Sequence, residues 1–137
     1  SKNSTTAGNN RRTFLRFSLA SVGGAVTAAK LRLSGNSVTS AKLVGVYGVS
    51  NITWGETTIT FNTAPMIGAK QGASKSVGLT AGLVTWDVTS YVRAQKMAGA
   101  TAVSFELKQD VANNEGPTTF SAREAGSNRP ELVVTSN

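Results

Sequence analysis

Apolar and polar residues alternate along several short segments of this chain. Leu15, Phe17 and Leu19 fall on one face of an extended chain, and the residues between them fall on the other. The segments 29–33 and 103–108 repeat the alternation, with charged residues, Glu106 among them, on the outer face. A period of two is the period of a β-strand, so the sequence predicts strands that bury one face and expose the other to solvent.

Short segments of this kind recur along the whole chain. Besides the three above, strands are predicted over residues 43–49, 57–61, 83–88, 118–123 and 131–135. About eight short strands separated by turn residues favour an all-β fold, an antiparallel two-sheet β-sandwich of the jelly-roll kind. The chain of 137 residues fits a single domain over 1–137, in which residues 1–10 are expected to form a flexible end.

Two features interrupt the strand pattern. Asp87 is a suitable N-cap for a helical turn over residues 88–93. Trp86 alternates with apolar neighbours and is expected in the core, whereas Trp54 precedes Gly55-Glu56 and could be exposed on a loop.

The composition removes most catalytic and metal chemistry. The chain has no Cys and no His, so disulfides, thiolates, imidazole bases and the commonest zinc and copper ligands are excluded. No two of its seven acidic residues share a face of one predicted strand, so we expect no carboxylate pair and no enzyme activity. A structural calcium ion could use oxygen atoms of Asp110, Asn113, Asn114 and Glu115, although the same cluster suits a polar hairpin loop, which we favour.

The sequence also bears on membranes and processing. No apolar run approaches the roughly 18 residues of a membrane span, which predicts no membrane insertion. The chain has no initiator Met and no signal-peptide pattern, so we interpret it as an excised domain or a processed product.

All of the net positive charge lies in the first 55 residues. The formal net charge is +7, and this part contains seven basic residues and no acidic one. The basic residues are Lys2, Arg11, Arg12, Arg16, Lys30, Arg32 and Lys42. In the remaining 82 residues seven basic and seven acidic side chains balance. Charge confined to one segment predicts a basic surface and therefore an anionic partner.

Several motifs, taken in order, resemble a known family. They are Arg12-Thr13-Phe14-Leu15-Arg16-Phe17, Ala29-Lys30-Leu31-Arg32-Leu33, Val46-Tyr47-Gly48-Val49, Trp54-Gly55-Glu56, Asn62-Thr63-Ala64-Pro65, Trp86-Asp87-Val88-Thr89-Ser90-Tyr91-Val92, Val103-Ser104-Phe105-Glu106-Leu107, Phe120-Ser121-Ala122-Arg123-Glu124 and Arg129-Pro130-Glu131-Leu132-Val133-Val134. With them the chain resembles, over residues 11–135, the DNRLRE domain, also called carbohydrate-binding module family 96. The order of the motifs carries the resemblance, since no single motif is specific. The resemblance also implies that Trp54 is a structural residue.

The chain departs from that family's pattern in three places. Domains of the family usually begin with an Asp- and Gly-containing segment and a strand ahead of the equivalent of Lys2, and this segment is absent here. Ser18 and Thr63 stand where relatives commonly carry Asp and Asn, which alters a local polar network without threatening the fold.

The resemblance implies a noncatalytic module of secreted bacterial polysaccharide-degrading enzymes or cell-surface proteins, with anionic polysaccharides such as alginate among its ligands. A uronate polymer carries a carboxylate on every sugar, and basic side chains at alternating strand positions can bind carboxylates by charge-assisted hydrogen bonds. The expected ligand-binding row consists of Arg12, Arg16, Lys30 and Arg32, with Lys2 and Arg11 at its end.

Each of these residues also has a structural interpretation. Arg16 could pair with Glu124 or Asp87 and stabilise a sheet. Lys30 and Arg32 could form the solvated face of a strand, which is the commonest place for outward charges. Lys2, Arg11 and Arg12 could belong to a mobile terminus, which would make them accessible but poorly preorganised.

Two other functions compete with binding of an acidic polysaccharide. A structural or adhesive extracellular subunit would use a strand from a neighbouring chain to complete the sandwich, which predicts strand-mediated self-association. Nucleic-acid binding would use the same positive charge, but it is disfavoured because exposed aromatic residues are scarce and no DNA or RNA motif is recognisable.

Overall fold

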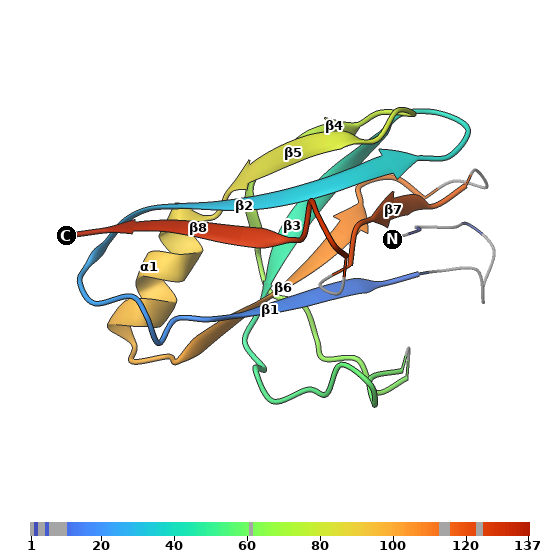
Figure 1. The fold of residues 1–137 in the computed structure, drawn as a ribbon. Helices are drawn as coiled ribbons and strands as arrows, with labels where there is room; N and C mark the ends of the chain where they lie inside the picture. The colour runs from blue at the N-terminus through green and yellow to red at the C-terminus, as the bar shows by residue number, and fades with distance from the viewer. Residues whose placement is uncertain (1, 3–4, 6–10, 61, 113–115, 123–124) are drawn as a thin grey trace.

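The two predicted sheets are present (Figure 1). The computed structural model describes residues 2, 5, 11–60, 62–112, 116–122 and 125–137. Within these residues the elements are β1 (Thr13–Ser18), β2 (Val26–Ser37), β3 (Lys42–Val49), β4 (Lys70–Val77), β5 (Gly82–Asp87), α1 (Thr89–Met97), β6 (Ala102–Gln109), β7 (Thr118–Phe120) and β8 (Glu131–Ser136). One sheet has the strand order β1-β6-β3-β4, and in the other β2 pairs with β5 on one edge and with β7 and β8 on the other. All pairings are antiparallel, which confirms the all-β sandwich.

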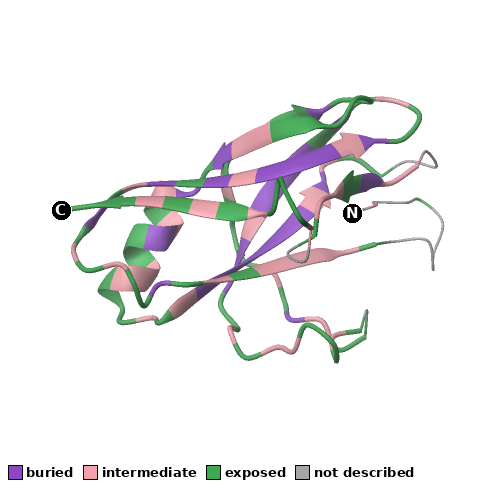
Figure 2. Cartoon of the chain, in the orientation of Figure 1, coloured by how far each residue is buried: buried purple, intermediate pink, exposed green. Residues whose placement is uncertain are grey.

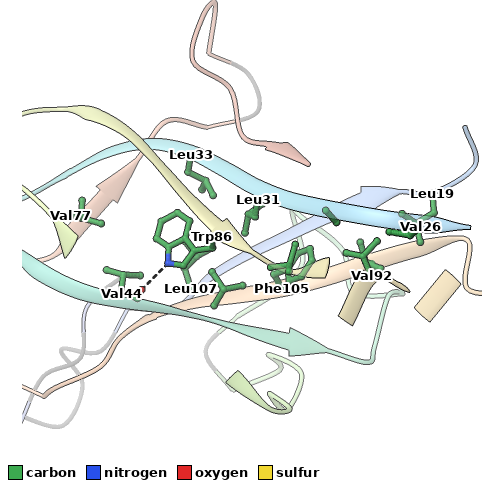
Figure 3. Packing of buried hydrophobic residues seen from close by; sticks show 14 residues of the cluster. Leu19, Val26, Leu31, Leu33, Val44, Val77, Trp86, Val92, Phe105 and Leu107 are labelled. Carbon is green, nitrogen blue, oxygen red and sulfur yellow. Dashed lines mark hydrogen bonds between the residues drawn. The ribbon is translucent and has the colours of Figure 1, made fainter. Parts of the chain in front are cut away.

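The alternation of apolar residues fills the space between the sheets. Buried residues concentrate on β2, β3 and β6, whose inner side chains meet in one core (Figure 2). Trp86 on β5 is fully buried, as expected, and its indole N–H donates to the carbonyl of Val44 on β3 at 2.9 Å (Figure 3). This hydrogen bond joins the two sheets and satisfies the only polar atom of the indole ring inside the core.

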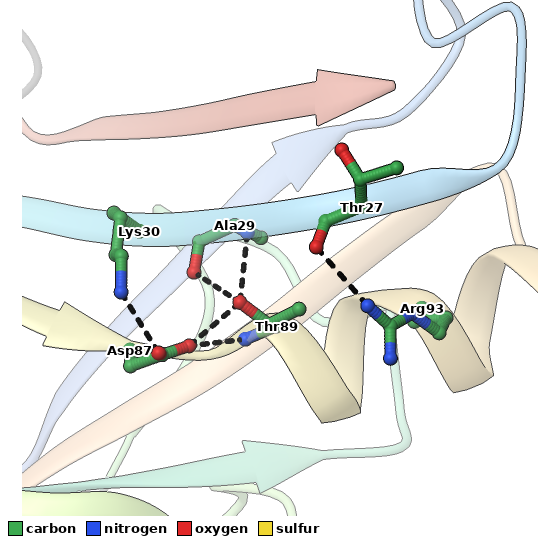
Figure 4. A network of polar contacts seen from close by, with 6 residues as sticks. All are labelled: Thr27, Ala29, Lys30, Asp87, Thr89 and Arg93. Atoms are coloured by element: carbon green, nitrogen blue, oxygen red, sulfur yellow. Dashed lines mark hydrogen bonds and ion pairs between the residues drawn. The ribbon is translucent and has the colours of Figure 1, made fainter. Parts of the chain in front are cut away.

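The helix begins slightly later than the sequence predicts. It starts at Thr89, with Val88 rather than Asp87 at the N-cap position. The Asp87 carboxylate still accepts hydrogen bonds from the backbone N–H of Thr89 at 3.0 Å and from its hydroxyl group at 2.6 Å, and it receives Lys30 Nζ at 2.8 Å (Figure 4). The Thr89 hydroxyl also accepts the N–H of Ala29, so this group connects the start of α1 to β2.

One predicted strand is absent, and one observed strand was not predicted. Residues 57–60 form no strand, because their backbone bonds locally: the N–H of Ile59 donates to the carbonyl of Gly55 at 3.0 Å, and the hydroxyl groups of Thr60 and Thr63 bond each other. Conversely, β4 was not expected from the sequence. It is an edge strand in which Val77 alone is a buried hydrophobic residue, so its sequence lacks the apolar alternation that reveals a strand.

Asp87→Asn tests the connection between α1 and β2. Hydrogen bonds from Lys30 and Thr89 lower the pKa of the Asp87 carboxyl far below its ordinary value of 3.8. A carboxylate with a depressed pKa stabilises the fold at pH values above its unfolded-state pKa, and this stabilisation is lost as the pH falls. We therefore expect the variant to be less stable than the wild type at neutral pH, by a difference that shrinks below about pH 4. Urea denaturation across the pH range measures this difference, and a pH-independent difference would contradict the assignment.

Candidate functional site

The loop between β3 and β4, residues 50–69, is fastened to the outer face of β1 and β6. Arg16 on β1 donates through Nη1 to the carbonyl groups of Ile52 at 3.0 Å and Trp54 at 2.5 Å. Arg12 lies four residues before Arg16, on the same face of the extended chain, and donates to the carbonyl of Pro65 at 3.0 Å. The two arginines thus hold the loop near its beginning and near its end.

Arg12 also neutralises a buried carboxylate. Its Nε and Nη2 atoms donate to the two oxygen atoms of Glu106 at 3.0 and 2.8 Å, a bidentate pair. Glu106 points to the outer face of β6, as the alternation predicts, but it is only 2% exposed. The expectation that Glu106 faces solvent is therefore wrong.

Trp54 is packed rather than free on a loop. The Arg16 guanidinium carbon lies 5.0 Å from the centroid of the indole ring, and the ring of Phe14 lies 5.9 Å away at a tilt of 57°. The indole N–H donates to the hydroxyl group of Ser104 on β6 at 3.1 Å. Contacts on several sides restrict the rotation of this side chain, so Trp54 presents a fixed, half-buried aromatic surface.

A cleft of about 580 Å³ lies beside this aromatic surface, between β1 and β7. Its wall on the side of the loop contains Phe14 and Trp54, and its basic groups come from Arg11 and Arg12. Hydroxyl groups line it as well, those of Thr13, Thr119 and Ser121. Aromatic surface, cations and hydroxyl groups in one open cleft are a combination suited to a polar ring compound that carries negative charge.

Arg11, which lines this cleft, is paired with Lys2. The N–H of each donates to the carbonyl of the other at 2.9 Å, which makes them an isolated antiparallel pair. Residues paired in this way project their side chains from the same face, with Cβ atoms about 5.5 Å apart. Arg11 is exposed and lines the cleft, and Lys2 is half-buried opposite it.

Lys30 and Arg32 are elsewhere. Both are on β2, in the other sheet, where Lys30 Nζ lies 2.8 Å from Asp87 and Arg32 Nη1 lies 3.5 Å from Glu131. The structure therefore does not bring Arg12, Arg16, Lys30 and Arg32 into one row. Consecutive strands of a sandwich can belong to different sheets, and the alternation within each strand does not reveal which sheet a strand joins.

The acidic residues that were expected to pair with Arg16 or to bind calcium have other positions or partners. Asp87 pairs with Lys30 and not with Arg16, while Glu124 lies outside the described residues. Of the four candidate calcium ligands, Asp110 pairs with Lys70 at 3.3 Å, and Asn113, Asn114 and Glu115 lie outside the described residues. In the part of the chain that the structure describes, no three acidic side chains gather as a metal site would require. No helix there is long and apolar enough to cross a membrane.

Comparison with known proteins identifies the family. The family model for carbohydrate-binding module family 96 matches residues 1–136. The chain belongs to this family. The module is also 28% identical over 137 residues to a gellan lyase of a Bacillus species, an alignment that covers 93% of the module and 5% of that protein. The family and this relative indicate a polysaccharide partner, and the module spans only a small part of the lyase that it matches.

Sequence reasoning missed two parts of the site. The aromatic wall was signalled by Phe14, an apolar residue at an outward position of a strand, which implies that something covers that face. The pairing of Arg12 with Glu106 left no local signal, because the two residues are 94 positions apart in the chain.

Arg16→Gln tests whether Arg16 holds Trp54 in place. Removal of the guanidinium group eliminates the cation–π contact and the hydrogen bonds to the loop, so we expect the emission of Trp54 to shift to longer wavelength and its quenching by acrylamide to increase. Trp86 is fully buried and should contribute unchanged emission. Lys96→Gln, on α1, is the control for the loss of one charge. Fluorescence identical to that of the wild type would show that Arg16 does not fix the indole ring.

Proposed function

We propose that the module binds an acidic polysaccharide, alginate or a similar uronate polymer, in the cleft between β1 and β7. The observation that carries this proposal is that the cleft places the exposed basic residue Arg11 beside the aromatic wall of Phe14 and Trp54. A sugar ring offers apolar C–H faces to an aromatic side chain, while a guanidinium group suits a carboxylate. A cleft of about 580 Å³ is of the usual size for a small-molecule ligand or a short stretch of polymer.

The comparisons support the same class of ligand. The relative is named for gellan, a polysaccharide, and family membership makes carbohydrate the expected partner of the module. Polysaccharide-binding modules of lyases typically act outside the cell, and we propose a secreted or cell-surface location for this one. We propose no catalytic role, since the cleft contains Glu56 as its one acidic side chain among the described residues.

The polymer preference is tested with alginate, gellan and a neutral glucan, each at low and at high salt. We expect binding of the two acidic polymers at about 20 mM salt and a marked loss at about 500 mM, because salt screens exposed charges. Trp54→Ala should weaken binding at either salt concentration, because it removes the aromatic wall and not a charge.

Two results would refute the proposal. If the neutral glucan bound as tightly as alginate and gellan, the carboxylates of the polymer would have no role in binding. Acidic-polymer binding that is unchanged in Trp54→Ala would place the ligand outside the cleft. Lys75→Gln, on the edge strand β4, is the control for a change of net charge away from the cleft.

A second candidate function is assembly through a strand of a neighbouring chain. On one side of the sandwich β4 and β5 contact each other. On the other side, hollows of about 580 and 260 Å³ separate β1 from β7 and β8. Most of the partly buried residues that border the core lie along this second side: Leu15, Phe17, Val22, Phe120, Leu132 and Val134. An added strand would cover their apolar surface.

Analytical ultracentrifugation distinguishes the two candidates. Addition of a strand from a neighbouring chain predicts dimers or longer assemblies at micromolar concentration. Phe17→Lys should prevent them, because it places a charge on the apolar surface between β1 and β8 that the added strand would cover. Ser90→Lys, on the exposed surface of α1, is the matched control and should leave assembly intact. A monomer throughout the concentration range would rule out self-assembly and leave polysaccharide binding as the function.

A further inference from the structure

The basic side chains of the first 55 residues differ in the partners that the protein provides for their charge. Three of them lie within 2.8–3.5 Å of a carboxylate: Arg12 with Glu106, Lys30 with Asp87, and Arg32 with Glu131. Lys30 and Arg32 are on β2, and Arg12 directly precedes β1, so these pairs involve both segments on which outward charges were expected to bind the ligand. A ligand carboxylate at any of them would compete with a carboxylate of the protein itself.

Two further cations are also committed to the protein. Arg16 uses Nη1 for the carbonyl groups of Ile52 and Trp54. Lys42 is buried, and its Nζ donates to the carbonyl and hydroxyl groups of Ser40. Arg16 is exposed but bonds the loop through Nη1, and the buried Lys42 ammonium group is directed to Ser40, just before the start of β3.

Lys2 and Arg11 are the exception. Neither has a carboxylate partner among the described residues, although their mutual backbone hydrogen bonds hold them directly opposite each other on one face. Like charges directly opposite in a β-pair repel, so an anion bound between the two side chains would relieve this repulsion. Arg11 lines the cleft, which places such an anion beside the aromatic wall of Phe14 and Trp54.

We propose that Lys2 and Arg11 together bind one carboxylate group, with the ring of that same uronate against the aromatic wall. The inference rests on the proposed function and makes it more specific: the module recognises a single uronate residue in a chain, not a row of carboxylates. Polymers that carry a carboxylate only on some of their sugars are then as suitable as polymers that carry one on every sugar.

Three trisaccharides test this reading of the ligand by calorimetry. They are an alginate trisaccharide with three carboxylates, a trisaccharide with one glucuronate and two neutral hexoses, and a neutral trisaccharide. We expect the first two to bind within about threefold of each other, which is the statistical advantage of three equivalent carboxylates, and the neutral one to bind at least about tenfold more weakly. An alginate trisaccharide that binds more than about tenfold tighter than the mono-uronate compound would show a row of sites and overturn the inference.

Substitutions locate the carboxylate. Lys2→Gln and Arg11→Gln should each weaken binding of the mono-uronate trisaccharide about tenfold, the loss expected for one charge-assisted hydrogen bond. The double variant should lose less than the product of the two single losses, because both side chains contact the same carboxylate. The melting temperature should not fall in either variant, since each substitution removes a repulsion between like charges.

The controls separate this inference from the proposed function. Lys75→Gln removes the same charge from an exposed edge strand and should bind like the wild type. If the wild type binds acidic polymers but Lys2→Gln and Arg11→Gln bind equally well, the two-cation site is refuted and the proposed function stands. If the wild type binds none of the acidic polymers at low salt, the proposed function itself fails.

Discussion

The ion pair between Arg12 and Glu106 connects three parts of the structure that are distant in sequence. It joins β1 to β6 and, through the carbonyl of Pro65, both strands to the 50–69 loop. A carboxylate that is 2% exposed is strongly unfavourable without a cation, and loss of one member of such a buried pair typically destabilises a protein by about 3–5 kcal/mol. Arg12 therefore neutralises the carboxylate beneath the covering loop and, together with Arg16, holds this loop on the outer face of the sheet. The cleft depends on the same contacts, because the loop supplies Trp54, which forms the aromatic wall with Phe14 of β1.

The contacts of Arg12 and Arg16 change how the basic residues in the segment 12–17 are interpreted. Two arginines on one strand face were interpreted as a surface that attracts anions, yet their nearest acceptors are a buried carboxylate and three carbonyl groups of the loop. An arginine suits this task because its planar group has five donors and can bind several acceptors at once. A lysine at position 12 would keep the charge but could not bond both oxygens of Glu106 through two nitrogen atoms, so the residue type at this position indicates a structural role.

The sequence predicts which side chains of a strand face the core better than it predicts which strands pair with one another. The alternation in β1, β2 and β6 correctly indicates which side chains enter the core, because that property depends on a period of two alone. The sheet to which β2 belongs depends on long-range pairing, and this is why Lys30 and Arg32 lie apart from Arg12 and Arg16. Edge strand β4 escaped prediction for the opposite reason: little of it is buried, so selection for apolar residues at every second position is absent. Burial of Glu106 also needed the structure, since its cover comes from another segment of the chain.

The net charge of this module does not show how many cations are available to a ligand, because some of them are paired within the protein. The acid-free segment of 55 residues would suggest seven available cations, but acidic residues from the later part of the chain, at positions 87, 106 and 131, fold back onto three of them. Folding therefore removes part of the charge segregation that the sequence shows. The charge that persists near the cleft is local: Arg11 lines the cleft together with the fixed Trp54 ring, and backbone hydrogen bonds pair Arg11 with Lys2. Preorganisation of this kind reduces the entropy lost on binding, so a few well-placed groups can contribute more to affinity than a larger number of dispersed charges.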